Sequence, residues 1–171
     1  MVYDLEVAVA GAVHAFMGVS WFGVNVVTEM IFVPMLTKST KLAELAPMGR
    51  FAPRVSAAGL GLGVMTILTG LAFLAIKYGA DPNVWLALGR TQAVLAALFT
   101  ALASLAFGIA ILRPAALGLT KDRPAAPPPP DAGIPEPLKP KLARVAVYMH
   151  VQMLFVVLML VFMVIAIEGG F

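Results

Sequence analysis

A histidine, a tryptophan, an asparagine and a glutamate interrupt an apolar stretch near the start of the chain. At the period of a helix one face carries His14, Gly18, Trp21, Asn25 and Thr28, with Glu29 beside it. Imidazole can bind a metal or exchange a proton, and a carboxylate can exchange a proton. Because exposing polar groups to lipid is costly, such a face turns towards the interior of a helix bundle. The stretch therefore predicts a buried site with ionisable groups.

A second group of candidate ligands lies near the end of the chain, in the segment YMHVQM. Met149, His150 and Met153 fall within about one helical turn. Imidazole and thioether groups are soft ligands that suit Cu(I), so the segment predicts a copper site. Methionine is also a common apolar filler, and plain packing is the competing interpretation.

The composition indicates which elements position these groups. The 171 residues are 61% hydrophobic and 12% charged, whereas roughly a quarter of the residues of a soluble domain are charged. We therefore predict an all-α integral membrane protein, an antiparallel four-helix bundle that forms one transmembrane domain in the lipid bilayer. The chain has no cysteine, which excludes disulfides, thiolate metal sites and covalently attached haem. Four apolar stretches are long enough to cross a hydrocarbon core of ~30 Å, namely residues 7–36, 55–78, 85–112 and 145–167.

Basic residues are concentrated in two of the three loops between these stretches. Because cytoplasmic loops carry the excess of lysine and arginine, both termini are predicted to lie outside the cell membrane. The positive charge is split between two loops rather than gathered in one patch, so we expect no nucleic-acid partner. Residues 114–141 are rich in proline and predict a flexible cytoplasmic linker, with docking of a partner on the proline run as the alternative. Ten of the twelve lysines and arginines lie in the two loops: Lys38, Lys41, Arg50, Arg54, Arg113, Lys121, Arg123, Lys139, Lys141 and Arg144.

Small residues recur along the second and third predicted helices. Such stripes let membrane helices approach closely, so they predict helix–helix contacts. The residues are Gly59, Gly63, Thr66 and Gly70 on one helix, and Ala93, Ala97, Thr100, Ser104 and Gly108 on the other.

The antiparallel order places one set of candidate residues in an outer layer. His14 lies about 10 Å below the outer end of its helix, at 1.5 Å per residue. Arg90, Met159 and Met163 fall at a similar depth on the third and fourth helices. The layer therefore combines an imidazole, a guanidinium and two thioethers.

Glu29 and His150 fall in an inner layer, near the cytoplasmic ends of their helices. We predict that they approach within hydrogen-bonding distance and are candidates for a proton relay, because an ionisable group within a membrane is a functional candidate. The alternative is a structural hydrogen bond of Glu29 to His150 or to Asn25. His14 and His150, the only two histidines, lie at opposite ends of the bundle and cannot bind one haem iron together.

The first helix also carries a family resemblance. His14 followed by Trp21 and Phe22 resembles the first helix of small bundle proteins of the HemJ-like protoporphyrinogen oxidase and CopD-like copper-resistance group. The run GRFAPRVSAAGLGLGVMTILTG is similar to the second helix of that group. Trp85 with Arg90 five residues later is similar to the opening of its third helix. The proline-rich linker and the methionine-rich fourth helix depart from the HemJ type.

The resemblance implies a non-covalent haem b or porphyrin in the bundle, with His14 on the iron. In that arrangement Arg90 pairs with a propionate and Trp21 lines the macrocycle, while depth makes Met159 or Met163 a candidate sixth ligand. The competing interpretation of His14 is a packing histidine bonded to a serine, a threonine or a carbonyl. For Arg90 it is a side chain that extends to the outer membrane surface.

Three functions remain open from the sequence. The first is a membrane haem b or porphyrin protein for redox or electron transfer, with a quinone or a redox protein as its partner. The second is a copper-binding or copper-transport membrane protein of the CopD-like type. The third is a non-catalytic accessory subunit, either of a larger membrane complex or of a homo-oligomer. The sequence leaves open whether the protein is an enzyme.

Overall fold

The computed structural model of the protein is almost entirely helical. No strand forms within the described ranges, where Lys41 and Gly133 pair only in an isolated β-bridge. The prediction of an all-α protein with four helices suited to a membrane is confirmed. The described residues are 2–79, 81–87, 91–121 and 129–168. Four helical segments among them are long and apolar enough to cross a membrane: Leu5–Lys38, Leu42–Tyr78, Thr91–Leu119 and Lys139–Ala166.

The first half of the chain forms two long helices. Helix α1 (Val2–Val27) passes through a π-helical turn, η1 (Thr28–Phe32), into α2 (Val33–Lys38) without a break. A 3-10 turn, η2 (Leu42–Leu45), then leads into α3 (Ala46–Tyr78). Helix α3 ends at Gly79, whose backbone φ of 84° lies in a region that residues other than glycine rarely adopt.

The second half repeats this plan. A short helix, α4 (Pro82–Ala87), precedes α5 (Thr91–Phe107). Helix α5 passes through a second π-helical turn, η3 (Gly108–Leu112), into α6 (Arg113–Lys121). The last helix, α7 (Lys139–Glu168), is uninterrupted.

Each π-helical turn is followed within two residues by a proline. Pro34 comes after η1 and Pro114 after η3. A proline has no N–H for the carbonyl one turn earlier, and its ring clashes with that carbonyl in a regular α-helix. A wider turn before the proline relieves the clash, which is a known cause of local helix distortion. The two prolines therefore account for the two bulges.

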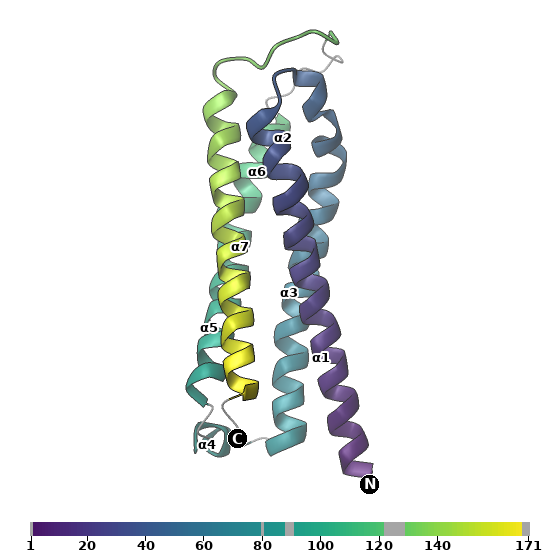
Figure 1. Cartoon of the computed structure of the whole chain (residues 1–171), viewed down its shortest axis with the longest axis vertical. Helices are drawn as coiled ribbons and strands as arrows, with labels where there is room; N and C mark the ends of the chain where they lie inside the picture. Colours follow the sequence, from purple (N-terminus) through teal and green to yellow (C-terminus); the bar gives the residue numbers. More distant parts are fainter. Residues whose placement is uncertain (1, 80, 88–90, 122–128, 169–171) are drawn as a thin grey trace.

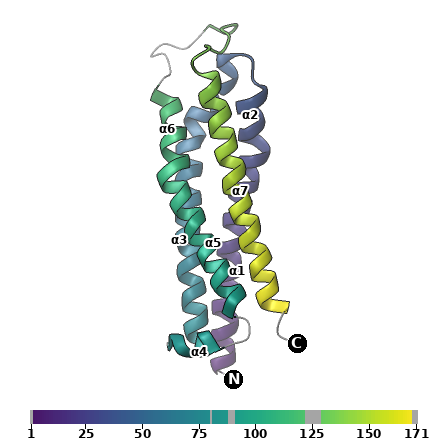
Figure 2. The ribbon, with the colours of Figure 1, turned by 90° about the vertical axis from the view of Figure 1, so that its left-hand side faces the viewer.

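The long helices run back and forth along one axis. Figure 1 shows the start of α1 and the end of α7 at the same end of the molecule, which we call the terminal end. The opposite end carries residues 39–45 and 129–138, and we call it the loop end. Helix α1 packs along α3, and α5 packs along α7. Figure 2 shows α4 lying across the terminal end, beneath α3 and α5.

Most of the buried apolar side chains pack into two clusters, neither of them at the terminal end. The loop-end cluster draws on every long helix, and the mid-bundle cluster consists of Trp21, Ala101, Val156 and Met159. No residue is buried in 5–20, 67–79 or 160–166. The loop-end cluster comprises Phe32, Val33, Leu36, Leu42, Leu45, Met48, Leu119, Leu138, Leu142, Val145, Ala146 and Met149.

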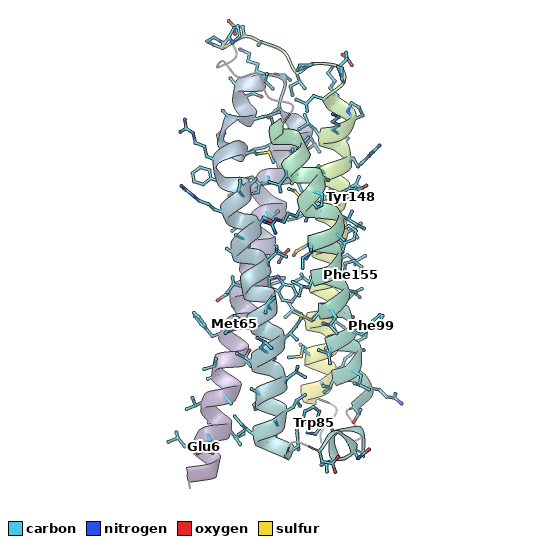
Figure 3. The ribbon with its side chains drawn as sticks, turned by 180° about the vertical axis from the view of Figure 1, so that it is seen from behind. Glu6, Met65, Trp85, Phe99, Tyr148 and Phe155 are labelled. Carbon is cyan, nitrogen blue, oxygen red and sulfur yellow. The ribbon has the colours of Figure 1, made fainter. Side chains whose placement is uncertain are left out.

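Apolar side chains also cover the outside of the bundle. Figure 3 shows Met65 and Phe99 on opposite outer sides of the helices, and Phe99 is 75% exposed. A water-soluble protein rarely leaves so many large apolar groups exposed, whereas lipid tails are a favourable environment for them. The outside of the bundle is therefore suited to a bilayer.

The structure differs from the predicted element bounds in two places. The expected helix 85–112 is split, since Trp85 belongs to α4 and its Nε1 donates to the Gly79 carbonyl at 2.7 Å. The expected linker 114–141 is helical at both of its ends, in α6 and in the start of α7. Proline at position 114 is tolerated inside the helix because the η3 bulge precedes it.

The described part of the linker is also attached to the bundle. The Leu42 N–H donates to the Ala132 carbonyl at 2.9 Å, and the Ile134 N–H donates to the Thr40 carbonyl at 3.3 Å. Leu138 is buried in the loop-end cluster. The expectation of a free linker is therefore wrong for residues 132–138.

Candidate functional site

His14 lies at the contact between α1 and α3. Its Nδ1 is 3.1 Å from the Thr66 carbonyl and 3.4 Å from the Thr69 hydroxyl. The ring stacks on Phe73 and covers Gly70, where an added Cβ would lie 2.8 Å from His14 Cε1. These contacts agree with the packing interpretation of His14, in which a carbonyl and a threonine are its partners.

Trp21 fills the same contact closer to the loop end. It is 2% exposed, and its indole covers Gly63, where an added Cβ would lie 2.9 Å from Trp21 Cε2. The glycines of α3 thus accept two rings from α1, one at Gly63 and one at Gly70. The room that small residues open between these helices is filled by the chain itself.

The arrangement of His14 meets one requirement of a haem ligand. A ligating histidine commonly donates one ring N–H to a carbonyl, and this fixes the other nitrogen as the ligand. With Nδ1 on Thr66, the Nε2 atom of His14 has no hydrogen-bond partner within the described ranges. The ring chemistry therefore fits an iron, but the side of His14 that faces Gly70 has no room for a macrocycle.

Among the other expected haem residues that the structure describes, Met159 packs against Trp21 and not against His14. Met159 is buried against Trp21 in the mid-bundle cluster, and Met163 is half-buried. Arg90 lies outside the described residues. Met159 lines the same cluster as Trp21 because both side chains point to the bundle axis at the level of Ala101.

Glu29 and His150 meet where α1 and α7 approach each other. The Oε1 atom of Glu29 and Nδ1 of His150 are in direct contact, which confirms the prediction that the two groups approach. The His150 side chain is 55% exposed, whereas that of Glu29 is 26% exposed. Glu29 Oε2 is buried and has no hydrogen-bond partner among the residues that the structure describes. The pair thus extends from the surface of the bundle to its interior.

The alternative partner of Glu29 is engaged elsewhere. The amide of Asn25 donates to the Trp21 carbonyl at 2.8 Å, and the hydroxyl of Thr28 donates to the Val24 carbonyl at 2.8 Å. Both polar groups are therefore satisfied within their own helix. Glu29 stands in the η1 bulge and is free to turn towards α7.

A second polar contact lies two residues further along α7. Gln152 Nε2 donates to Ser104 Oγ at 2.7 Å, and both side chains are buried. Gln152 Oε1 has no hydrogen-bond partner within the described part of the chain. Sequence reasoning missed this pair because Ser104 was assigned only to a packing stripe. The signal that could have found it is Gln152 itself, an amide within the apolar stretch 145–167 that needs a partner inside the bundle.

Charged residues indicate the depth of these contacts. His150 lies six residues from Arg144, or about 9 Å at 1.5 Å per residue. Ser104 lies nine residues from Arg113, or about 14 Å on the same scale. Both polar contacts therefore lie inside the apolar part of the bundle, where every polar group needs a partner from the protein.

The copper ligands of the alternative interpretation do not converge. Met149 is buried in the loop-end cluster, while His150 faces Glu29. Met153 is half-buried. The part of the chain that the structure describes has no group of three or more His, Asp or Glu side chains placed to hold a metal ion. Adjacent helical residues point about 100° apart, which separates Met149 from His150.

Comparisons with protein-family models, with curated proteins and with solved structures found no match for this chain. The resemblance to the HemJ-like and CopD-like group therefore depends on short sequence motifs alone: those around His14 and Trp21, the run GRFAPRVSAAGLGLGVMTILTG, and Trp85 with Arg90.

Proposed function

We propose that the protein is an antiparallel four-helix bundle of the cell membrane, with both termini outside. We further propose that it carries protons from the cytoplasmic side into the bundle through Glu29 and His150. In this orientation the loop end, with its many basic residues, faces the cytoplasm. The distribution of lysine and arginine supports the orientation, and the helix lengths support the membrane location.

The observation that supports proton transfer is the contact of His150 Nδ1 with Glu29 Oε1. His150 is the more exposed partner of the pair, so it is the group that receives the proton from the cytoplasmic side. The proton passes between Nδ1 and Oε1, and rotation of the carboxyl group brings it to the buried Oε2 position. Imidazole and carboxyl groups can each accept and release a proton, which a structural amide or hydroxyl does not do.

The proton-transfer proposal is tested with purified protein in liposomes that contain a pH-sensitive dye. A potassium gradient with valinomycin provides the driving force. We expect proton uptake in the wild-type protein and its loss in Glu29→Gln, which keeps the shape of the side chain but cannot carry a proton. Glu6→Gln, at the terminal end of the same helix, is the matched control. Equal uptake in wild-type and Glu29→Gln liposomes contradicts the proposal.

The orientation is tested separately with single cysteines, because the natural chain has none. A cysteine at Ser39 should react with a membrane-impermeant maleimide only from the cytoplasmic side. A cysteine at Gly79 should react only from the outside. Reversed labelling contradicts the orientation without touching the proton-transfer proposal.

A second candidate function is haem b binding, and the free Nε2 of His14 favours it. When bound, haem b supplies one-electron transfer. His14 would hold the iron through Nε2, with the Thr66 carbonyl fixing the ring. A redox group in the terminal half would then receive protons from Glu29, and a quinone or a redox protein would be its partner.

Visible spectra of the detergent-solubilised protein test this candidate. A Soret band with sharp α and β bands after dithionite reduction supports haem, and His14→Ala should abolish it while His150→Ala leaves it. A colourless protein with stoichiometric copper supports the copper alternative instead. Absence of both groups supports the accessory-subunit alternative.

A further inference from the structure

A groove lies on the surface of the loop half, between α3 and α6. The two helices contact each other, and Figure 2 shows them side by side there. All but two of the lining side chains are apolar, and the two exceptions are a guanidinium on α6 and a hydroxyl on α3. The lining residues are Ala52, Pro53, Ser56, Arg113, Ala116 and Leu117. The groove therefore brings two hydrogen-bond donors together from separate helices.

The charge of Arg113 is not neutralised by the part of the chain that the structure describes. Its side chain is exposed and forms no ion pair with a described residue. The described carboxylates of the loop end are engaged with other groups, namely Glu44 with the Thr40 N–H, Asp131 with Lys41, and Glu136 with Lys139. The guanidinium is therefore available to an anion from outside the chain.

The hydroxyl of Ser56 is available as well. Hydroxyl groups on a helix can donate to the carbonyl one turn earlier, and Thr66 and Thr69 of α3 do so at 2.8 and 2.7 Å. Ser56 makes no such bond to a described residue and lines the groove instead. Its O–H can donate to an anion that is bound by Arg113.

The groove lies where the apolar part of the bundle ends. Residues 91–112 carry no charged side chain, and Arg113 follows them directly. Ile109, one turn closer to the terminal end, is 50% exposed. In the orientation proposed above, Arg113 lies at the level of the inner headgroups and Ile109 at the level of the acyl chains. An occupant with a charged part at Arg113 and an apolar part beside Ile109 is a lipid.

Charge complementarity identifies the kind of lipid. Every long helical segment contributes an exposed basic residue without a carboxylate partner in the described ranges: Lys38, Arg50, Arg54, Arg113 and Arg144. The cytoplasmic leaflet carries anionic lipids, and basic pockets between transmembrane helices on that side bind their headgroups. Arginine suits a phosphate because its planar guanidinium can donate to two oxygens at once.

We propose that the groove at Arg113 and Ser56 binds the phosphate of one anionic phospholipid of the inner leaflet. Arg113 donates to the phosphate group, Ser56 donates to another of its oxygens, and the acyl chains lie along the apolar surface beside Ile109. The lipid thereby bridges α6 and α3. The inference rests on the membrane location and orientation of the proposed function, and it does not depend on proton transfer.

Native mass spectrometry of the full chain in a mild non-ionic detergent tests the site. Phosphatidylglycerol is the anionic probe, and phosphatidylcholine is the probe with the same phosphate but no net charge. Arg113→Gln removes the charge from the groove, and Ser56→Ala removes the hydroxyl. Arg50→Gln is the matched control, because it removes an exposed charge of α3 that does not line the groove. Inorganic phosphate at millimolar concentration is added as a competitor without acyl chains.

We expect the wild-type protein to bind one phosphatidylglycerol more tightly than phosphatidylcholine. The dissociation constant of that lipid should rise about tenfold in Arg113→Gln and about fivefold in Ser56→Ala, the effects of losing a charged and a neutral hydrogen-bond donor. Arg50→Gln should change it less than about twofold, since exposed charges away from the lipid contribute little. Inorganic phosphate should not displace the lipid.

Four results overturn the inference: equal binding of the two lipids, unchanged affinity in Arg113→Gln, an equal loss in Arg50→Gln, or displacement by inorganic phosphate. The first three show only a diffuse attraction, and the fourth shows a site for free phosphate. Any of them together with the expected cysteine labelling leaves the proposed orientation intact. Reversed labelling overturns that orientation, and with it the assignment of the lipid to the inner leaflet.

Discussion

The loop half and the terminal half of the bundle differ in what surrounds their apolar side chains. At the loop end, side chains from every long helix bury one another, and the linker adds Leu138 to the same cluster. At the terminal end, residues 5–20 and 160–166 include no buried side chain. The helices there expose mainly apolar side chains, for which lipid tails are a favourable environment. Packing therefore fixes the loop half, while the bilayer supports the terminal half.

The polar contacts follow the same division. His14, in the terminal half, bonds to Thr66 and Thr69 of the neighbouring helix α3. Glu29 and Gln152, in the better packed half, bridge α7 to α1 and to α5. Ionisable and amide groups inside a membrane need fixed partners, and only the packed half can fix them across three helices. The comparison predicts that proton transfer depends on the polar contacts of the loop half, and that the free energy of unfolding depends on the buried clusters.

The largest effect is expected for Trp21→Ala, which removes the main side chain of the mid-bundle cluster. The free energy of unfolding should fall by about 3–5 kcal/mol, the usual cost of deleting a large buried ring. Phe16→Ala, five residues away and 68% exposed, is the control and should change it by less than about 0.5 kcal/mol. Unfolding in mixed micelles measures both. Equal losses would contradict the division between packed and lipid-facing positions.

A smaller loss is expected for Gly70→Ala. The added Cβ would lie 2.8 Å from His14 Cε1, so the ring must move and its bond to Thr66 is strained. Overpacking of this kind costs about 1–3 kcal/mol. Gly23→Ala, where a Cβ meets nothing within 4 Å, is the control on α1. A variant as stable as the wild type would mean that the α1–α3 contact is looser than the ring positions indicate.

Pro34→Ala should change geometry more than stability. Restoring the N–H lets α1 continue as a regular helix through η1, which turns Glu29 away from His150. Lost and gained hydrogen bonds of about 1 kcal/mol each nearly cancel in the free energy of unfolding. The yield of a disulfide between cysteines placed at positions 29 and 150 measures the contact and should fall. Pro53→Ala in α3, which has no such bulge, is the control.

The smallest effect is expected at the loop end for Lys41→Ala. The Lys41 ammonium is 2.8 Å from Asp131, but these side chains are 48% and 89% exposed. Exposed ion pairs contribute about 0–1 kcal/mol, and salt screens them. Thermal unfolding at low and high salt should therefore differ little between Lys41→Ala and wild type. A larger loss would show that this pair, rather than Leu138, holds the linker.

Much of the candidate site followed from residue types and spacing. Glu29 and His150 lie at matching depths when helices alternate in direction, and the structure brings them into contact. The copper ligands did not follow, because Met149 and His150 are adjacent on one helix and turn to different neighbours. The Gln152–Ser104 hydrogen bond was not predicted either, because a serine in a stripe of small residues indicates helix–helix packing rather than a specific polar contact.

The sequence by itself determined the class of the protein and the depth of its polar groups. Both depend on chain length, hydropathy and a fixed rise per residue, which are local properties. Only the tertiary structure decided which groups meet. The bulges before Pro34 and Pro114 rotate the following segments, and the rings of His14 and Trp21 fill the glycine surface of α3. These contacts depend on the shapes of two helices together, so the residue pattern of a single helix cannot predict them.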